Sequence, residues 1–278
     1  MVAPFANSPE FSRLLAGDDH VDLARIALEI GRDAYPELDI EDYVERIDRL
    51  ADRARGRFRP GSLVREILGQ INWVLFVEEE FRGNREDYYD PRNSYLNEVL
   101  DRGLGIPITL SLVYGTMAER LGLTIAGVDL PLHFMLRVDD GDQVCFVDPF
   151  HDGAVYDREG CEQKVSEIAE RAVTLSDAAI LPCSNKVLIS RMLRNLKAIY
   201  ERSGDIASLL PIQRRLTALN RHNPGELRDL GVLCAQADQL GEAIEPFQAY
   251  LELSPTASDA PEIEELLVAL RREVARWN

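Results

Sequence analysis

The last third of the chain repeats itself with a period of 34 residues, and this repeat strongly limits the folds open to it. A shift of 34 positions aligns apolar residues in pairs: Leu196 with Leu230, Tyr200 with Cys234, and Leu216 with Tyr250. Periods of 20 to 50 residues are typical of solenoids, whose units bury their apolar faces only against their neighbours. The period therefore predicts stacked helical hairpins over residues 185–278.

The second copy of the repeat carries the residue types that a tetratricopeptide repeat needs. Its small, small, aromatic and proline positions are Gly231, Ala243, Phe247 and Pro255. The first copy, roughly residues 190–223, is degenerate and has Gln213 in the aromatic position. A last amphipathic helix around Leu267 would cap the stack. We expect this repeat region to bind a protein partner.

The front part of the chain has a different pattern. Helical periodicity dominates residues 1–82, whereas residues 83–184 mix helical segments with two short stretches of alternating apolar residues. These stretches, Leu130 to Val138 and Gln143 to Phe150, predict strands of a small antiparallel sheet. The expected fold class is α+β, with a helical subdomain over 1–82 and a core over 83–184, followed by the helical repeats.

Composition excludes several classes of function. The chain has 48 acidic and 31 basic residues, a net charge of −17. Residues 185–278 contain 13 acidic and 12 basic residues, which leaves 35 and 19 in the first 184, a net charge of −16. The electrostatic field of this negative charge repels phosphate backbones and anionic lipids. We therefore expect neither nucleic acid nor a membrane as a partner.

The sequence also indicates a compartment. No stretch of about 18 apolar residues could span a bilayer, and Met1 to Glu10 lacks the pattern of a signal peptide. Four scattered cysteines show no metal-ligand spacing. A cytoplasmic protein without a cofactor is expected. The sequence does not indicate an oligomeric state.

A buried helix is predicted at the centre of the core. Asn93 or Ser94 could cap a short helix from Tyr95 to Asp101. Gly103 and Gly105 would end that helix. Pro107 suits the first turn of the next helix, where its missing N–H costs nothing. This second helix would run to about Leu121, end at Gly122, and be buried on most sides.

The two predicted strands bring a histidine and an aspartate together. If Asp140 and Gly141 form a two-residue hairpin loop, the register places His133 directly opposite Asp148 on one face. A carboxylate in that place fixes the tautomer of the imidazole and stabilises its protonated form. The same register turns Cys145 to the other face as a buried apolar thiol. A hydrogen-bonded pair with a purely structural role remains an alternative.

Four motifs around this pair resemble the bacterial SirB family, which implies a transglutaminase-like core followed by tetratricopeptide repeats. They are Asp87 to Asn97, Gly105 to Ser111, Leu132 to Phe134, and Val147 to Phe150. The family's name reflects an association with the regulation of invasion genes. A related core in an animal F-box protein implies adaptor roles.

The resemblance also indicates that the nucleophilic cysteine of the active enzymes is missing. Active transglutaminase-like enzymes place a cysteine at the start of a helix that packs against the sheet carrying His and Asp. There the helix terminus and the imidazolium lower the pKa of the thiol. By similarity, 15 residues before Gly122, this position holds Pro107, while His133 and Asp148 carry over. The sequence therefore predicts a non-catalytic interaction or regulatory scaffold with a vestigial pair.

Alternatives remain open at the same site. Ser111 or Thr109 could present a hydroxyl to His133, or the pair could activate water, which would make the protein a hydrolase or acyl transferase. His133, Asp148 and His151 could form a set of metal ligands. The metal-free site is the expected one, because the direction of His151 after Pro149 cannot be predicted.

A polar segment precedes the buried helix. As an ordinary loop it would be structural, and at the mouth of a cleft it could bind a peptide-like ligand. Its candidate binding residues are Tyr88, Tyr89, Asp90, Arg92 and Asn93.

Overall fold

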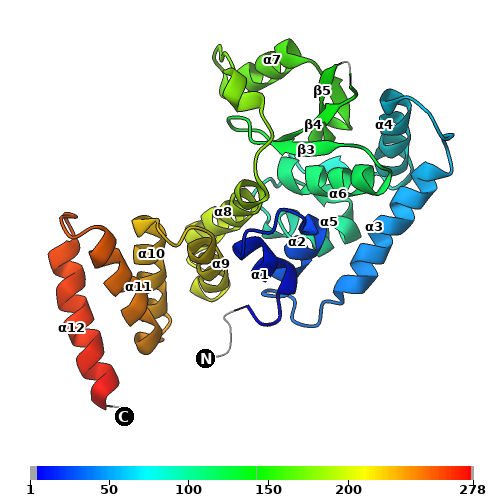
Figure 1. Cartoon of the computed structure of the whole chain (residues 1–278). Coiled ribbons are helices and arrows are strands. Elements are labelled where there is room, and N and C mark those ends of the chain that lie inside the picture. The colour runs from blue at the N-terminus through cyan, green and yellow to red at the C-terminus, as the bar shows by residue number, and fades with distance from the viewer. Residues whose placement is uncertain (1–4, 142, 277–278) are drawn as a thin grey trace. The chain divides into compact units, whose positions relative to one another are not determined.

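The computed structural model describes residues 5–141 and 143–276, which divide after Met192 into two compact units. The division falls within helix α8 (Asn185–Ser203). The first unit contains helices, a small sheet and a two-stranded parallel pair, and the second is helical (Figure 1). The predicted α+β fold class is confirmed.

The first unit holds most of the secondary structure. Its helices besides the start of α8 are α1 (Pro9–Leu15), α2 (Leu23–Gly31), α3 (Ile40–Arg55), α4 (Val64–Asn72), α5 (Leu96–Arg102), α6 (Pro107–Arg120) and α7 (Arg158–Ala169). The strands are β1 (Arg82–Gly83), β2 (Leu104–Gly105), β3 (Ile125–Val128), β4 (Met135–Asp139), β5 (Val144–Asp148) and β6 (Ala154–Tyr156). Four shorter helical turns are η1 (Trp73–Glu78), η2 (Pro91–Asn93), η3 (Pro149–His151) and η4 (Asp177–Ile180).

Helix α6 is buried, and it begins at Pro107 as the sequence predicts. Pro107 occupies its first turn, and Thr109 Oγ1 accepts a hydrogen bond of 3.1 Å from the backbone N–H of Ile106. Every residue from Pro107 to Ala118 is buried. The chain leaves the helix through Gly122, whose φ of +85° favours glycine. Helix α6 can therefore serve as the central element on which the sheet packs.

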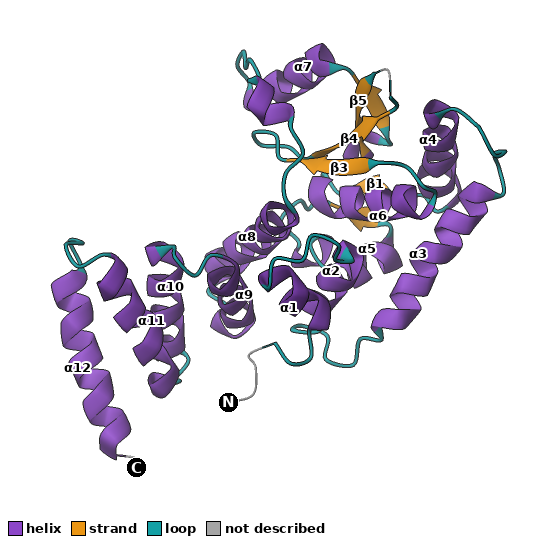
Figure 2. Cartoon of the chain, viewed as in Figure 1, coloured by secondary structure: helices purple, strands orange, loops and turns teal. Residues whose placement is uncertain are grey.

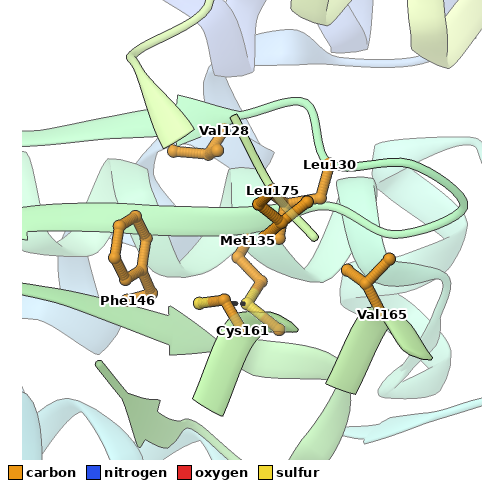
Figure 3. Close-up of a cluster of buried hydrophobic side chains, with 7 residues drawn as sticks. All are labelled: Val128, Leu130, Met135, Phe146, Cys161, Val165 and Leu175. Atoms are coloured by element: carbon orange, nitrogen blue, oxygen red, sulfur yellow. Dashed lines mark hydrogen bonds between the residues drawn. The ribbon is translucent and has the colours of Figure 1, made fainter. Parts of the chain in front are cut away.

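The four-stranded antiparallel sheet, in the order β3-β4-β5-β6, lies between α6 and α7 (Figure 2). Gly115 of α6 faces Leu136 of β4, on one side of the sheet. On the other side, β-strand residues, α7 and the segment after it form one apolar cluster (Figure 3). Its buried members are Val128, Leu130, Met135, Phe146, Cys161, Val165 and Leu175.

The hairpin register differs from the predicted one by two residues. Leu136 pairs with Val147 and Val138 pairs with Cys145. Asp140 closes the turn by donating its N–H to the carbonyl of Gln143 at 3.1 Å. Asp142, part of the predicted hairpin connection, lies outside the described residues. A shift of two keeps every side chain on its predicted face, because the side chains alternate with period two.

Two other local expectations are wrong. Helix α5 begins after Tyr95, and neither Asn93 nor Ser94 caps it. The side chain of Asn93 instead donates to the carbonyl of Asp87 at 2.7 Å and accepts from Asn84 at 3.1 Å. The strands are also shorter than predicted, since the chain bends away from the sheet before Met135. Gly103 does end α5, with φ of +66°.

The second unit consists of the end of α8 followed by four helices, which are α9 (Ile206–Leu219), α10 (Pro224–Gln236), α11 (Leu240–Leu253) and α12 (Ala260–Arg276). Gly231 of α10 lies against the fully buried ring of Phe247 in α11. A Cβ at Gly231 would lie 2.6 Å from that ring, which is why the small position of the repeat must stay small. Gln213, in the degenerate aromatic position, is buried and donates to the carboxylate of Glu226 at 2.8 Å.

None of the helices in residues 5–141 and 143–276 is both long enough and apolar enough to cross a bilayer.

Candidate functional site

His133 lies in the loop that connects β3 to β4. Its backbone N–H donates to the carbonyl of Leu130 at 3.2 Å, and Leu132 adopts a left-handed conformation with φ of +62°. Arg191 supports the loop by donating to the carbonyl of Leu130 at 3.0 Å and pairing with Asp129. This turn directs the imidazole inward, so His133 is buried while the neighbouring Leu132 is exposed.

Asp148 ends strand β5 and is fully buried. Its Oδ2 atom lies 2.8 Å from Nε2 of His133 and 2.7 Å from Nδ1 of His151. Its Oδ1 atom accepts the backbone N–H of Phe150 at 3.1 Å. One carboxylate oxygen therefore serves two imidazoles, and the other oxygen fixes the orientation of the carboxylate. The predicted contact between His133 and Asp148 is present.

The turn after β5 places the second histidine. Pro149 starts the helical turn η3, and the N–H of Gly153 donates to the carbonyl of Asp148 at 3.0 Å. Asp152 has φ of +56° and ends the turn. His151 thus comes back over the aspartate from which the turn began. Its side chain is 21% exposed, which makes it the solvent-facing member of the cluster.

The charge state of Asp148 follows from its partners. Burial alone would raise the pKa of this carboxyl group, but hydrogen bonds from His133 and His151 outweigh it and lower the pKa to about 2. The carboxylate is therefore ionised at neutral pH and only accepts hydrogen bonds. His133 must carry a proton on Nε2 and His151 on Nδ1. In their neutral forms, Nδ1 of His133 and Nε2 of His151 keep a lone pair.

Aromatic rings surround the two imidazoles. The ring of Phe150 packs edge-on to His151, with centroids 5.3 Å apart, and to His133 at 6.3 Å. Tyr88 packs against Phe150 at 6.3 Å and extends this wall to the surface. Gly83 lies beneath Phe150, where a Cβ would come within 2.5 Å of the ring. The site therefore has an apolar wall that excludes water from one side of the cluster.

The structure does not bring the candidate hydroxyls to His133. Thr109 Oγ1 donates to the carbonyl of Asn93 at 2.7 Å and accepts from Ile106, so its hydroxyl is used within the helix start. Ser111 is buried, and its Oγ atom has no hydrogen-bond partner in the described part of the chain. It lines a separate small cavity of about 90 Å³ with Thr116 and Cys183. Among the described residues, the only hydrogen-bond partner of the His133 ring is Asp148.

The polar segment before α5 divides into two parts. Tyr88 and Tyr89 are 39% and 59% exposed, and their rings pack edge-on with centroids 5.4 Å apart. Asp90 is buried and pairs with Arg92 at 2.8 Å, and Asn93 is buried within the loop. Burial would raise the pKa of Asp90, but the hydrogen bonds from Arg92 lower it. Of the five candidate binding residues, Tyr88 packs against Phe150 and therefore lies next to the histidine cluster.

None of the four cysteines resembles an activated thiol. Burial raises the pKa of all four, in the case of Cys161 to about 12. Cys145 faces away from the histidines, as predicted, but it is half-buried rather than buried, because it borders a surface groove beside Leu68. A nucleophilic cysteine needs a lowered pKa and a neighbouring base, and these thiols have neither.

Two residues of this site go beyond what the sequence predicts. The sequence offers His151 only as a metal ligand of unknown direction, and it does not predict the aromatic wall that Phe150 forms. The spacing Asp-Pro-x-His carries a usable signal, since a proline-started helical turn brings residue i+3 back beside residue i. This signal predicts His151 beside Asp148.

Comparisons with known proteins agree with this architecture. A profile of the transglutaminase-like superfamily matches residues 41–194, and a profile of the tetratricopeptide repeat matches residues 196–268. A UPF0162 protein of Xylella fastidiosa strain Temecula1 is 32% identical over 269 residues, covering 95% of this chain and 96% of the relative.

Two other relatives match a smaller share of the chain. A UPF0162 protein of Haemophilus influenzae is 27% identical and covers 81% of this chain and 84% of its own length. Mouse F-box only protein 21 is 35% identical over 152 residues, which is 51% of this chain and 23% of the mouse protein.

Proposed function

The chain belongs to the transglutaminase-like superfamily, and from that premise we propose that it is a non-catalytic cytoplasmic scaffold that binds a protein partner through its repeat unit. We also assign it to the SirB family, on the four motifs around Pro107, His133 and Asp148. In this account the histidine–aspartate pair survives as a structural element of the core.

This proposal rests mainly on the groups that surround the side chain of His133. Its imidazole has the carboxylate partner of a catalytic dyad, but the first turn of α6 begins with Pro107. Thr109 is committed to backbone partners, and Ser111 opens onto a different cavity. Covalent acyl transfer requires a nucleophile within reach of the base, so these surroundings support a non-catalytic role. The four free cysteines fit a reducing compartment.

The repeat unit offers a surface for the partner. Tetratricopeptide repeats present helix faces that bind other proteins. In this unit a groove of about 380 Å³ lies along α8, α9 and α10. It combines apolar side chains with both signs of charge, and its lining includes Tyr200, Ile206, Arg228, Asp229 and Val232. Such a mixture suits a peptide segment with an apolar anchor and flanking charges.

The test is capture of the partner by the full chain expressed in its own host, followed by crosslinking and mass spectrometry. Val232→Arg places a charge in the groove, and Leu253→Arg is the matched control on an exposed residue of α11. We expect one protein to be captured by the wild type, His133→Gln and Leu253→Arg but not by Val232→Arg. Capture that persists in Val232→Arg, or no specific capture, would overturn the proposal.

A further inference from the structure

His151, the second histidine of the site, adds a third possible metal ligand to His133 and Asp148. A histidine–aspartate dyad needs one imidazole, yet Oδ2 of Asp148 receives both His133 and His151. Nδ1 of His151, Nε2 of His133 and this oxygen all lie within 4.8 Å of one another. Three ligand atoms on three separate residues thus converge on one point, at the end of β5.

From this convergence we propose that His133, Asp148 and His151 bind a divalent transition-metal ion of the zinc type, and that this is a site distinct from the repeat surface. Two imidazoles and one carboxylate are ligands of intermediate softness, which suit Zn²⁺ and related ions. Ca²⁺ and Mg²⁺ prefer sets of oxygen ligands, so the same cluster discriminates against them.

The distances allow such an ion after a small adjustment. Metal–ligand bonds of about 2.1 Å in tetrahedral geometry place neighbouring ligands about 3.4 Å apart. The two oxygen–nitrogen distances, 2.8 and 2.7 Å, would therefore lengthen by less than about 1 Å, and the two nitrogen atoms, which lie within 4.8 Å of each other, would also have to settle at about 3.4 Å. Each neutral imidazole would move its proton to the other ring nitrogen and present its lone pair to the ion.

The surroundings of the cluster support the ligands. The N–H of Phe150 holds Oδ1 of Asp148 at 3.1 Å, and so leaves Oδ2 to face the ion. The ring of Phe150 shields both imidazoles. His151 is the partly exposed ligand, so an ion and one water molecule could enter on its side. The net charge of −16 over the first 184 residues favours the approach of a cation.

The experiment uses the full chain after treatment with a chelator and gel filtration. Zn²⁺ is titrated by calorimetry, and Co²⁺ serves as the spectroscopic probe because its visible absorption reports ligand geometry. We expect one Zn²⁺ per chain, displacement of Co²⁺ by Zn²⁺, and no comparable binding of Mg²⁺. Zn²⁺ should also raise the melting temperature, because an ion that binds only the folded state stabilises it.

The variants separate this site from accidental binding. His151→Ala and Asp148→Asn should each weaken Zn²⁺ binding by more than about 100-fold, since each removes a ligand. His20→Ala and His222→Ala remove exposed histidines elsewhere and should leave it unchanged. His151 is partly exposed, so its variant should fold even if Asp148→Asn does not. No Zn²⁺ uptake, or uptake unchanged in a folded His151→Ala variant, would overturn the inference without affecting the proposed partner binding.

Discussion

Nε2 of His133 lies 2.8 Å from Oδ2 of Asp148, and both side chains are inaccessible to solvent. A buried carboxylate needs hydrogen-bond donors, and this one has His133, His151 and the N–H of Phe150. Loss of the His133 ring would leave Asp148 with two donors and a space where an imidazole had packed.

We therefore expect His133→Ala to lower the free energy of unfolding by about 1–3 kcal/mol. The cost arises from the lost charge-assisted hydrogen bond and from the space left by the ring. Chemical denaturation of the metal-free protein measures it. The control is His20→Ala, whose side chain is 97% exposed and whose loss should change stability by less than about 0.5 kcal/mol. Equal stability of the two variants would contradict the structural role of the pair.

The thiols provide a second prediction. Because burial raises the pKa of every cysteine, we expect none to react with iodoacetamide faster than a free thiol at neutral pH. Half-buried Cys145 and Cys183 should react slowly, and fully buried Cys161 and Cys234 only after unfolding. Peptide mapping after timed labelling gives the order. A thiol that reacts within seconds in the native protein would show that an activated nucleophile exists.

Gly83 tests how the site is supported. Its Cβ would meet the ring of Phe150 at 2.5 Å and the carbonyl oxygen of the same residue at 2.8 Å. Gly83→Ala should therefore displace the turn that carries His151 and destabilise the protein by about 1–3 kcal/mol. Gly69→Ala is the matched control, because a Cβ added to that glycine of α4 would point into open space. Thermal melting that ranks the two variants equally would contradict the close packing of Gly83 and Phe150.

A similar pair of glycines tests the repeat unit. Gly231→Ala would force a Cβ against Phe247 and should destabilise the packing of α10 on α11 by about 1–3 kcal/mol. Gly241→Ala has open space around it and lies in the first turn of α11, so it should be neutral or slightly stabilising. Hydrogen exchange of α10 and α11 would locate the effect. Unchanged exchange in Gly231→Ala would mean that these helices do not pack as the repeat pattern predicts.

Local signals in the sequence predicted much of the fold. Pro107 at the start of α6 and Gly103 at the end of α5 act through their own backbone preferences, which need no knowledge of distant residues. The 34-residue period predicted the helices of the second unit for a similar reason, because each repeat packs against its neighbour.

Features that depend on distant contacts were predicted less well. The turn sequence Asp-Asp-Gly-Asp offers two overlapping two-residue loops, and the observed register differs by two residues from the one that an Asp140-Gly141 loop predicts. Asn93 could cap a helix, but its side chain bonds across the loop to Asn84 and Asp87. The contact of His133 with Asp148 forms through the bend at Leu132 rather than across paired strands. The correct contact was therefore predicted from an incorrect register.

The most direct test of the central claim asks whether the His133–Asp148 pair activates any nucleophile. The native full chain is treated separately with iodoacetamide and a fluorophosphonate, and intact mass spectrometry counts the adducts in the wild type and in His133→Gln. We expect no adduct whose formation depends on His133. A rapid single adduct on Ser111, Thr109 or a cysteine that disappears in His133→Gln would contradict the account and identify the protein as an enzyme.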